Sequence, residues 1–302
     1  MTADPVLTLA WLVLAHLSAD FILQTQGIAR DKFQTGGRAW RGLGAHLAGV
    51  GVCLLPVPLA FGVPGLEFLV VVVAAHAAID RAKIVWTRHA EAVAIARAHR
   101  EHEAAPAPDG LGSAWTPVPA ALFVADQLAH LAVIGLAWAV FLSAAPLTSA
   151  WVSATGVALG GWDQAIVART ALVVVVLLDL AIVNVRAAAL FVATLVHPRE
   201  VVTGHEVDAG PRDASDPPTA PAARLPSPAR IGATIGVLER LLIVTFVLTG
   251  AQAAIGFVVA AKTLARFKQL DDRQFAEYYL LGTLASVSVA LGTGLLGQAA
   301  LR

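Results

Sequence analysis

Residues 66–86 read LEFLVVVVAAHAAIDRAKIVW, and this stretch decides the fold. A helix of roughly 20 mostly apolar residues is long enough to cross the hydrocarbon core of a membrane. The charged residues of this stretch include Glu67 and Arg81, and its second half carries His76, Asp80 and Lys83, which recur at helical spacing. It therefore predicts a transmembrane helix that carries polar groups on one face.

The composition of the whole chain agrees with a membrane protein. Of its 302 residues, 57% are hydrophobic and 14% are charged, whereas a soluble domain carries roughly 25% charge. Lys plus Arg and Asp plus Glu both number 21, so no basic field points to nucleic acid, and we expect membrane lipids as partners. The single cysteine, Cys53, excludes an intramolecular disulfide and a thiolate zinc cluster.

We predict an all-α, polytopic transmembrane helix bundle of about eight spans. The seventh candidate is short and could be half of a re-entrant hairpin that turns near Gly250; if it merges with the sixth, seven spans remain. The fifth exceeds one membrane thickness, so it should tilt or project. The candidate spans are 6–23, 42–61, 66–86, 118–142, 165–195, 231–248, 253–267 and 275–296.

The loops predict the orientation and the division of the chain. Lys and Arg gather between spans one and two, after spans three and five, and before span eight, which makes these loops cytoplasmic and both termini external. The first 29 residues lack Lys and Arg, so we interpret the first run as a retained span rather than a cleaved signal. We expect a five-helix part at 1–197, a flexible cytosolic linker at 198–230 and a three-helix part at 231–302.

Ionisable side chains recur inside the first four spans. A histidine precedes an aspartate by four residues in spans one and three, and follows it by four in span four, where the chain runs the other way. Because the reversed order cancels the reversed direction, the histidines should share one layer, with the aspartates roughly 6 Å nearer the cytoplasm. With a histidine near the start of span two, the predicted cluster comprises His16, Asp20, His46, His76, Asp80, Asp126 and His130.

Imidazole and carboxylate groups are ligands of divalent zinc, iron or manganese, so all seven residues are candidate metal ligands. Two ions about 3.5–4 Å apart could activate a water molecule and clamp a phosphoryl or acyl oxygen. Asp20, Asp80 and Asp126 are also candidate catalytic groups, and Lys83 or Gln24 could stabilise developing negative charge. The spacing does not separate a ligating aspartate from one that orients a ligating histidine, and without metal the pairs would be interhelical polar clamps.

The C-terminal part carries polar groups of its own. Lys262 and Arg266 share a helix face and could hold an anionic lipid headgroup at the interface, or simply anchor the helix there. Glu239 and Glu277 are predicted to lie toward the same cytoplasmic side.

At these residues the chain resembles a bacterial family of multi-pass membrane proteins called domain of unknown function 3307. The similar segments are HLSADFILQ at 16–24, HAAIDRAK at 76–83, DQLAH at 126–130, ERLLI at 239–243, AKTLARF at 261–267 and EYYLLGTL at 277–284. This resemblance implies a multi-pass membrane protein and no particular reaction. We therefore expect the protein in the bacterial cytoplasmic (inner) membrane.

Several functions are compatible with this pattern. We favour a metal-dependent intramembrane hydrolase or transferase that acts on a lipid or a phosphorylated amphiphile. A transporter of protons or divalent metal also uses His and Asp chains, but it needs polar groups toward the outer side, where helices one to four are nearly apolar. A non-catalytic assembly or sensor role and haem ligation by paired histidines stay open.

Overall fold

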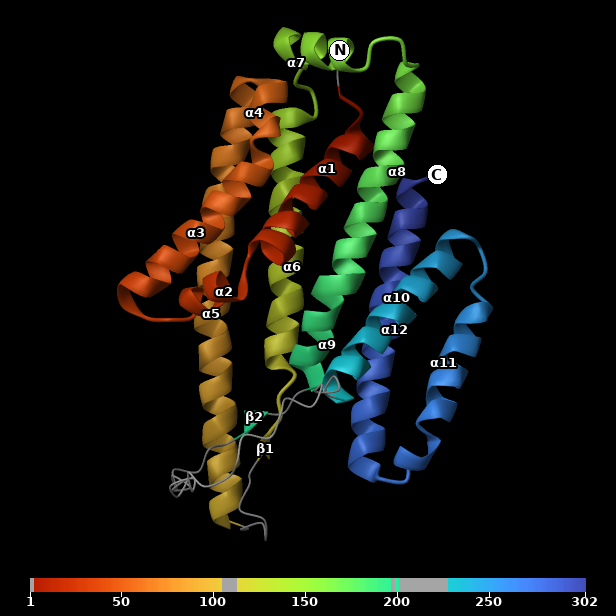
Figure 1. Cartoon of the computed structure of the whole chain (residues 1–302). Helices are drawn as coiled ribbons and strands as arrows, with labels where there is room; N and C mark the ends of the chain where they lie inside the picture. The colour runs from red at the N-terminus through yellow and green to blue at the C-terminus, as the bar shows by residue number, and fades with distance from the viewer. Residues whose placement is uncertain (1–2, 105–112, 197–198, 201–227) are drawn as a thin grey trace, which may run out of the picture.

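The computed structural model describes residues 3–104, 113–196, 199–200 and 228–302. Nearly all of these residues are helical, and the predicted all-α transmembrane bundle is confirmed (Figure 1). The described strands are two-residue segments, β1 (Ser113–Ala114) and β2 (Arg199–Glu200), which pair in antiparallel register. Residues 201–227 of the expected linker lie outside the described residues, and the division into two membrane parts stays a prediction.

The N-terminal helices begin with α1 (Pro5–Ser18), whose first turn is capped by the Asp4 side chain, which accepts a 2.8 Å hydrogen bond from the backbone N–H of Leu7. A π-helical segment, η1 (Ala19–Leu23), continues α1. The short helix α2 (Gln26–Lys32) then folds back against α3 (Gly36–Leu54). Gly42 permits this close contact, because a Cβ atom there would lie 2.6 Å from the backbone nitrogen of Lys32.

The long helices that follow alternate in direction along the bundle, whereas α7 lies across its upper end (Figure 1). The longest is α5, whose 42 residues extend beyond one membrane thickness. Two further π-helical segments occur: η2 continues α6, and η3 joins α8 to α9. The bounds of all the helical elements after α3 are α4 (Pro56–Phe61), α5 (Val63–Ala104), α6 (Val118–Ala137), η2 (Trp138–Leu142), α7 (Ser149–Ala158), α8 (Gln164–Ile182), η3 (Val183–Ala187), α9 (Ala188–Val196), α10 (Pro228–Leu248), α11 (Ala254–Ala265), the 3-10 turn η4 (Phe267–Gln269) and α12 (Arg273–Ala300).

Seven helices in the described residues are long and apolar enough to cross a membrane. The seventh candidate, 253–267, forms only the 12-residue helix α11, which is roughly 18 Å long and too short to span. The sixth and seventh candidates nevertheless do not merge, because a turn with Gly250 at φ 78° separates α10 from α11. This hairpin returns the chain, and both termini lie toward the upper end of the bundle (Figure 1).

One of the two buried apolar clusters of the described residues lies in the half of the bundle nearer the N-terminus. Several of its buried residues lie on the helices that carry the histidines. Leu12 comes before His16 on α1 and Val72 comes before His76 on α5, whereas Ile134 comes after His130 on α6. Because neighbouring helices are antiparallel, all of these residues lie on the same side of the histidines. The candidate site therefore lies directly beneath an apolar layer.

Arg240 ties the C-terminal helices to the rest of the bundle. This residue of α10 is 3% exposed and donates from Nε to the backbone oxygen of Asn184 in η3, at 2.7 Å. Its Nη1 donates to Ser286 Oγ in α12, at 3.1 Å. One guanidinium thus joins three helical segments, which suits a long polar side chain buried among transmembrane helices.

Candidate metal centre

The seven predicted histidines and aspartates come from four neighbouring helices and lie together. His16 lies in the last turn of α1 and Asp20 lies in η1, and α3, α5 and α6 supply the remaining members. Six of the seven are at most 4% exposed, and the Asp20 side chain is 10% exposed. Any role of these residues in metal binding or catalysis stays a prediction at this point.

The centre of the cluster is a pair of imidazoles. His46 Nε2 and His76 Nε2 lie 2.9 Å apart, and Asp20 Oδ1 is 3.4 Å from each of them. Asp80 Oδ2 approaches the same two nitrogens, at 3.4 Å and 3.8 Å. In a tetrahedral shell with ligands about 2.0–2.1 Å from the ion, neighbouring ligand atoms are about 3.3–3.4 Å apart. Each carboxylate oxygen and the histidine pair therefore form a triangle the size of one face of such a shell.

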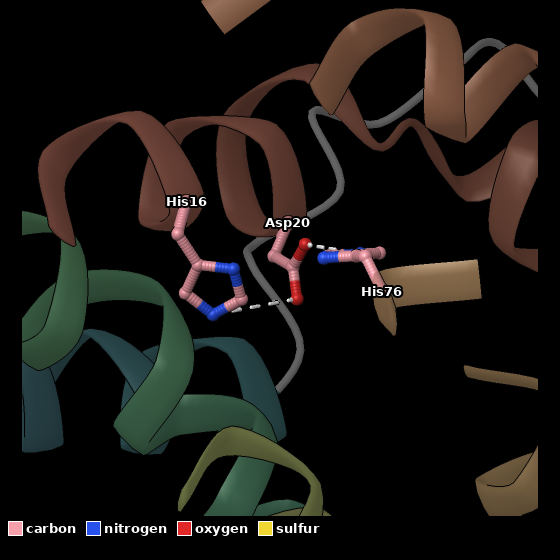
Figure 2. Close-up of side chains that lie close together, drawn as sticks. All are labelled: His16, Asp20 and His76. Carbon is pink, nitrogen blue, oxygen red and sulfur yellow. Dashed lines mark ion pairs between the residues drawn. The ribbon is translucent and has the colours of Figure 1, made fainter. Parts of the chain in front are cut away.

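Asp20 joins this pair to His16. Figure 2 shows its carboxylate between the imidazoles of His16 and His76, with one oxygen turned toward each. The distance from Asp20 Oδ2 to His16 Nε2 is 3.9 Å, and Gln127 Nε2 donates to the same oxygen at 3.4 Å. Asp20 Oδ1, which faces the histidine pair, is buried and has no hydrogen-bond partner in the described part of the chain.

Asp126 and His130 extend the cluster on α6. His130 Nδ1 lies 2.9 Å from the backbone oxygen of Asp126, so Nδ1 carries the proton and Nε2 presents its lone pair. His130 Nε2 and Asp126 Oδ1 are both buried without a hydrogen-bond partner among the residues described. One ligand atom each from Asp80, Asp126 and His130 lie within 4.8 Å of one another. Asp80 thus lies close both to the His46–His76 pair and to the two residues on α6.

Two lysines place positive charge against the aspartates. Lys32 Nζ donates to Asp80 Oδ2 at 2.5 Å and to Gln24 Oε1 at 2.8 Å, and Lys32 itself is only 6% exposed. Lys83 Nζ donates to Asp126 Oδ2 at 2.6 Å. Gln24 thus holds a lysine rather than facing the histidine pair.

The charges of the cluster do not balance when its imidazoles are all neutral. Three aspartates and two lysines leave one net negative charge when the four imidazoles are neutral. Isolated charge is costly inside a membrane and is therefore paired or functional. One divalent ion would change the balance to one net positive charge. The burial, the spacing and the unpartnered Asp20 oxygen all suit an ion bound against the histidine pair.

Sequence reasoning missed two polar residues of the cluster, Lys32 and Gln127. Lys32 was assigned to a cytoplasmic loop, and nothing in the periodicity indicates that α2 folds back onto the bundle. Gln127 had a signal, an amide inside a predicted span. The Gln127 amide links Asp20 to Asp126 by donating hydrogen bonds of 3.4 Å and 3.1 Å to these two carboxylates.

The polar residues predicted in the C-terminal part do not join this cluster. Lys262 Nζ pairs with Glu239 Oε2 at 2.6 Å and lies 5.6 Å above the ring of Tyr279. Arg266 donates to Gln269. Glu277 pairs with Arg273, and both side chains are mostly exposed. The predicted headgroup site at Lys262 and Arg266 stays a prediction.

Comparison with known proteins gives a family and no activity. The sequence model of a family described as "Protein of unknown function (DUF3307)" matches residues 8–158, which include all seven residues of the cluster. The C-terminal segments that resembled this family lie outside the matched residues. No curated protein and no solved structure matches the chain.

Proposed function

Since the chain belongs to the DUF3307 family, a membership that names no reaction, we propose its function from the site: a metal-dependent hydrolase or transferase of the membrane. The proposal depends on one observation, the His46–His76 pair at 2.9 Å with one oxygen each of Asp20 and Asp80 within 3.4–3.8 Å of both Nε2 atoms. The ion is a divalent metal such as zinc, iron or manganese, because imidazole nitrogen and carboxylate oxygen suit these metals. The membrane is the bacterial cytoplasmic membrane.

The ligands are assigned from the distances. His46, His76, Asp20 and Asp80 bind the ion, and Lys32 orients Asp80 by holding its Oδ2 atom. His16 and Gln127 orient Asp20, since both contact its Oδ2 atom. Partners of this kind fix a ligand in place and are as necessary as the ligand itself.

The remaining residues supply the chemistry beside the ion. When bound by these ligands, a divalent ion would supply an activated water and would polarise a phosphoryl or acyl oxygen. Asp126, whose Oδ1 atom is unpartnered, accepts the proton from the attacking water and returns it to the leaving group. Lys83 stabilises the negative charge that develops on the substrate. The substrate is a lipid or a phosphorylated amphiphile, because the site is buried among transmembrane helices.

Metal analysis of the purified full-length protein tests the metal centre. We expect about one divalent ion per chain in the wild type and a loss of at least tenfold in His76→Ala. His89→Ala is the matched control, because His89 is an exposed histidine on the same helix. Wild-type protein that contains no metal after purification and zinc loading would refute the metal centre.

Lipid analysis of a deletion strain tests the reaction. Complementation with the wild-type protein should restore a lipid profile that Asp126→Ala does not restore. If all strains have the same lipids while metal or proton flux appears in proteoliposomes, the protein is a transporter. If neither changes, a non-catalytic role as an assembly factor or sensor replaces the enzyme.

A further inference from the structure

A cavity lies beside the cluster, at the end of the bundle predicted to face the cytoplasm. Its volume is about 280 Å³, and it is partly open. Lys83, Thr87 and Glu91 line it from α5, with Pro119 and Phe123 from α6. Phe33, which follows α2, and Thr194 of α9 complete the wall.

Lys83 separates this cavity from the candidate metal centre. Its side chain is 24% exposed, whereas that of its partner Asp126 is 2% exposed. The ammonium lies 2.6 Å from Asp126 Oδ2 and 5.1 Å above the ring of Phe123, which also lines the cavity. A group that enters the cavity therefore meets Lys83 before it can reach the aspartate.

The wall of the cavity suits one end of an amphiphile. Phe33, Pro119 and Phe123 are apolar, whereas Thr87 and Thr194 carry hydroxyl groups near the lysine. Arg88 holds the Phe33 wall by donating hydrogen bonds to the backbone oxygens of Phe33 and Gln34. The volume equals that of roughly nine water molecules in the liquid, so a polar headgroup fits and acyl chains must stay outside.

The charge balance favours a single negative charge on the incoming group. With one divalent ion bound, the cluster carries one net positive charge, which a monoanion neutralises. A phosphodiester is a monoanion, and it can be attached to the chains of a membrane lipid.

We propose that this cavity binds the phosphodiester headgroup of a membrane amphiphile, and that the headgroup draws the Lys83 ammonium away from Asp126. The exchange places the anion beside the metal centre and frees the Asp126 carboxylate at the same time. This inference rests on the proposed function and names its substrate class. Lys83 is then the residue that recognises the substrate.

Calorimetric titration of the full-length, zinc-loaded protein in detergent tests the proposal. The probes are dihexanoyl phosphatidylglycerol, dihexanoyl phosphatidylcholine, whose choline cancels the headgroup charge, and inorganic phosphate. We expect the phosphatidylglycerol to bind at least tenfold more tightly than either of the others. Lys83→Met should remove this preference, and Thr194→Trp, which fills the cavity, should weaken binding at least tenfold. Lys268→Met removes an exposed lysine outside the cavity and should change nothing.

Zinc content measured on the same samples separates the two proposals. Zinc should stay at the wild-type amount in all three variants, because none of them alters a proposed ligand. Protein that binds zinc but shows no preference dependent on Lys83 overturns the headgroup site alone. Equal affinity for inorganic phosphate overturns the amphiphile in favour of a soluble phosphate. Wild-type protein without zinc overturns the metal centre itself.

Discussion

Replacement of Lys32 by methionine removes a buried positive charge while it keeps most of the side-chain length. Lys32 Nζ lies 2.5 Å from Asp80 Oδ2, and the two side chains are 7% and 5% exposed. Removal of one partner from a buried ion pair costs about 3–5 kcal/mol, because the other charge is left uncompensated. We expect the free energy of unfolding of the metal-free protein to fall by about this amount.

The same substitution should cost less when zinc is present. Asp80 is a proposed ligand, so the ion would balance its charge after the lysine is removed. The remaining loss is a charged hydrogen bond, worth about 1.5–3 kcal/mol. Titration with sodium dodecyl sulfate in mixed micelles, with either EDTA or excess zinc, measures both values. Lys268→Met is the control, because it removes an exposed lysine and should leave both values unchanged.

Two results would refute this reasoning. A cost of less than about 1 kcal/mol in EDTA would mean that the Lys32–Asp80 pair does not stabilise the fold. An equal cost with and without zinc would mean that Asp80 does not bind the ion. The second result would leave the ion pair intact and remove one ligand from the proposed centre.

Three further predictions use the same unfolding assay. Gly42→Ala should destabilise the protein by about 1–3 kcal/mol, because its Cβ would meet the backbone of α2. Gly44→Ala is the control and should be neutral or slightly stabilising, because a Cβ there has open space. An equal effect of the two substitutions would contradict the close α2–α3 contact. Arg240→Met leaves the backbone carbonyl of Asn184 and the Ser286 hydroxyl without their donor, so it should lower the free energy of unfolding by at least about 1–3 kcal/mol. An unchanged stability would show that Arg240 does not hold α10. Glu277→Gln should have no measurable effect, because its pair with Arg273 is exposed, and a clear loss would mean that this pair is buried in the membrane-bound protein.

The position of the seven histidines and aspartates could be predicted because three simple rules combine. Residues four apart share a helix face, adjacent spans are antiparallel, and ionisable groups avoid lipid. His76 and Asp80 on α5 therefore had to meet Asp126 and His130 on α6 at matched depth. The distances within the cluster could not be predicted, because they depend on how closely the helices pack.

Lys32 and the short α11 show where the sequence rules end. Lys32 lies in a helix of seven residues that is too short to have a reliable hydrophobic period, and its place follows from contact between α2 and Gly42. The segment 253–267 is apolar enough for a span, but its helix begins only after the turn at Gly250 and ends at Ala265. In both cases the outcome is set by turns and backbone contacts rather than by the periodicity of apolar residues.

The arrangement of polar and apolar layers favours an enzyme over a carrier. A carrier must expose its site to both faces in turn, so polar groups should continue on either side of the histidines. On the side nearer the N-terminus, the buried cluster that includes Leu12, Phe68 and Ile134 is entirely apolar. On the other side, Lys83 and the cavity lead outward. A site that is closed by an apolar layer at one end and approached through a lysine at the other suits a substrate that arrives and leaves by the same face. The absence of flux in proteoliposomes containing zinc-loaded protein is therefore the expected result.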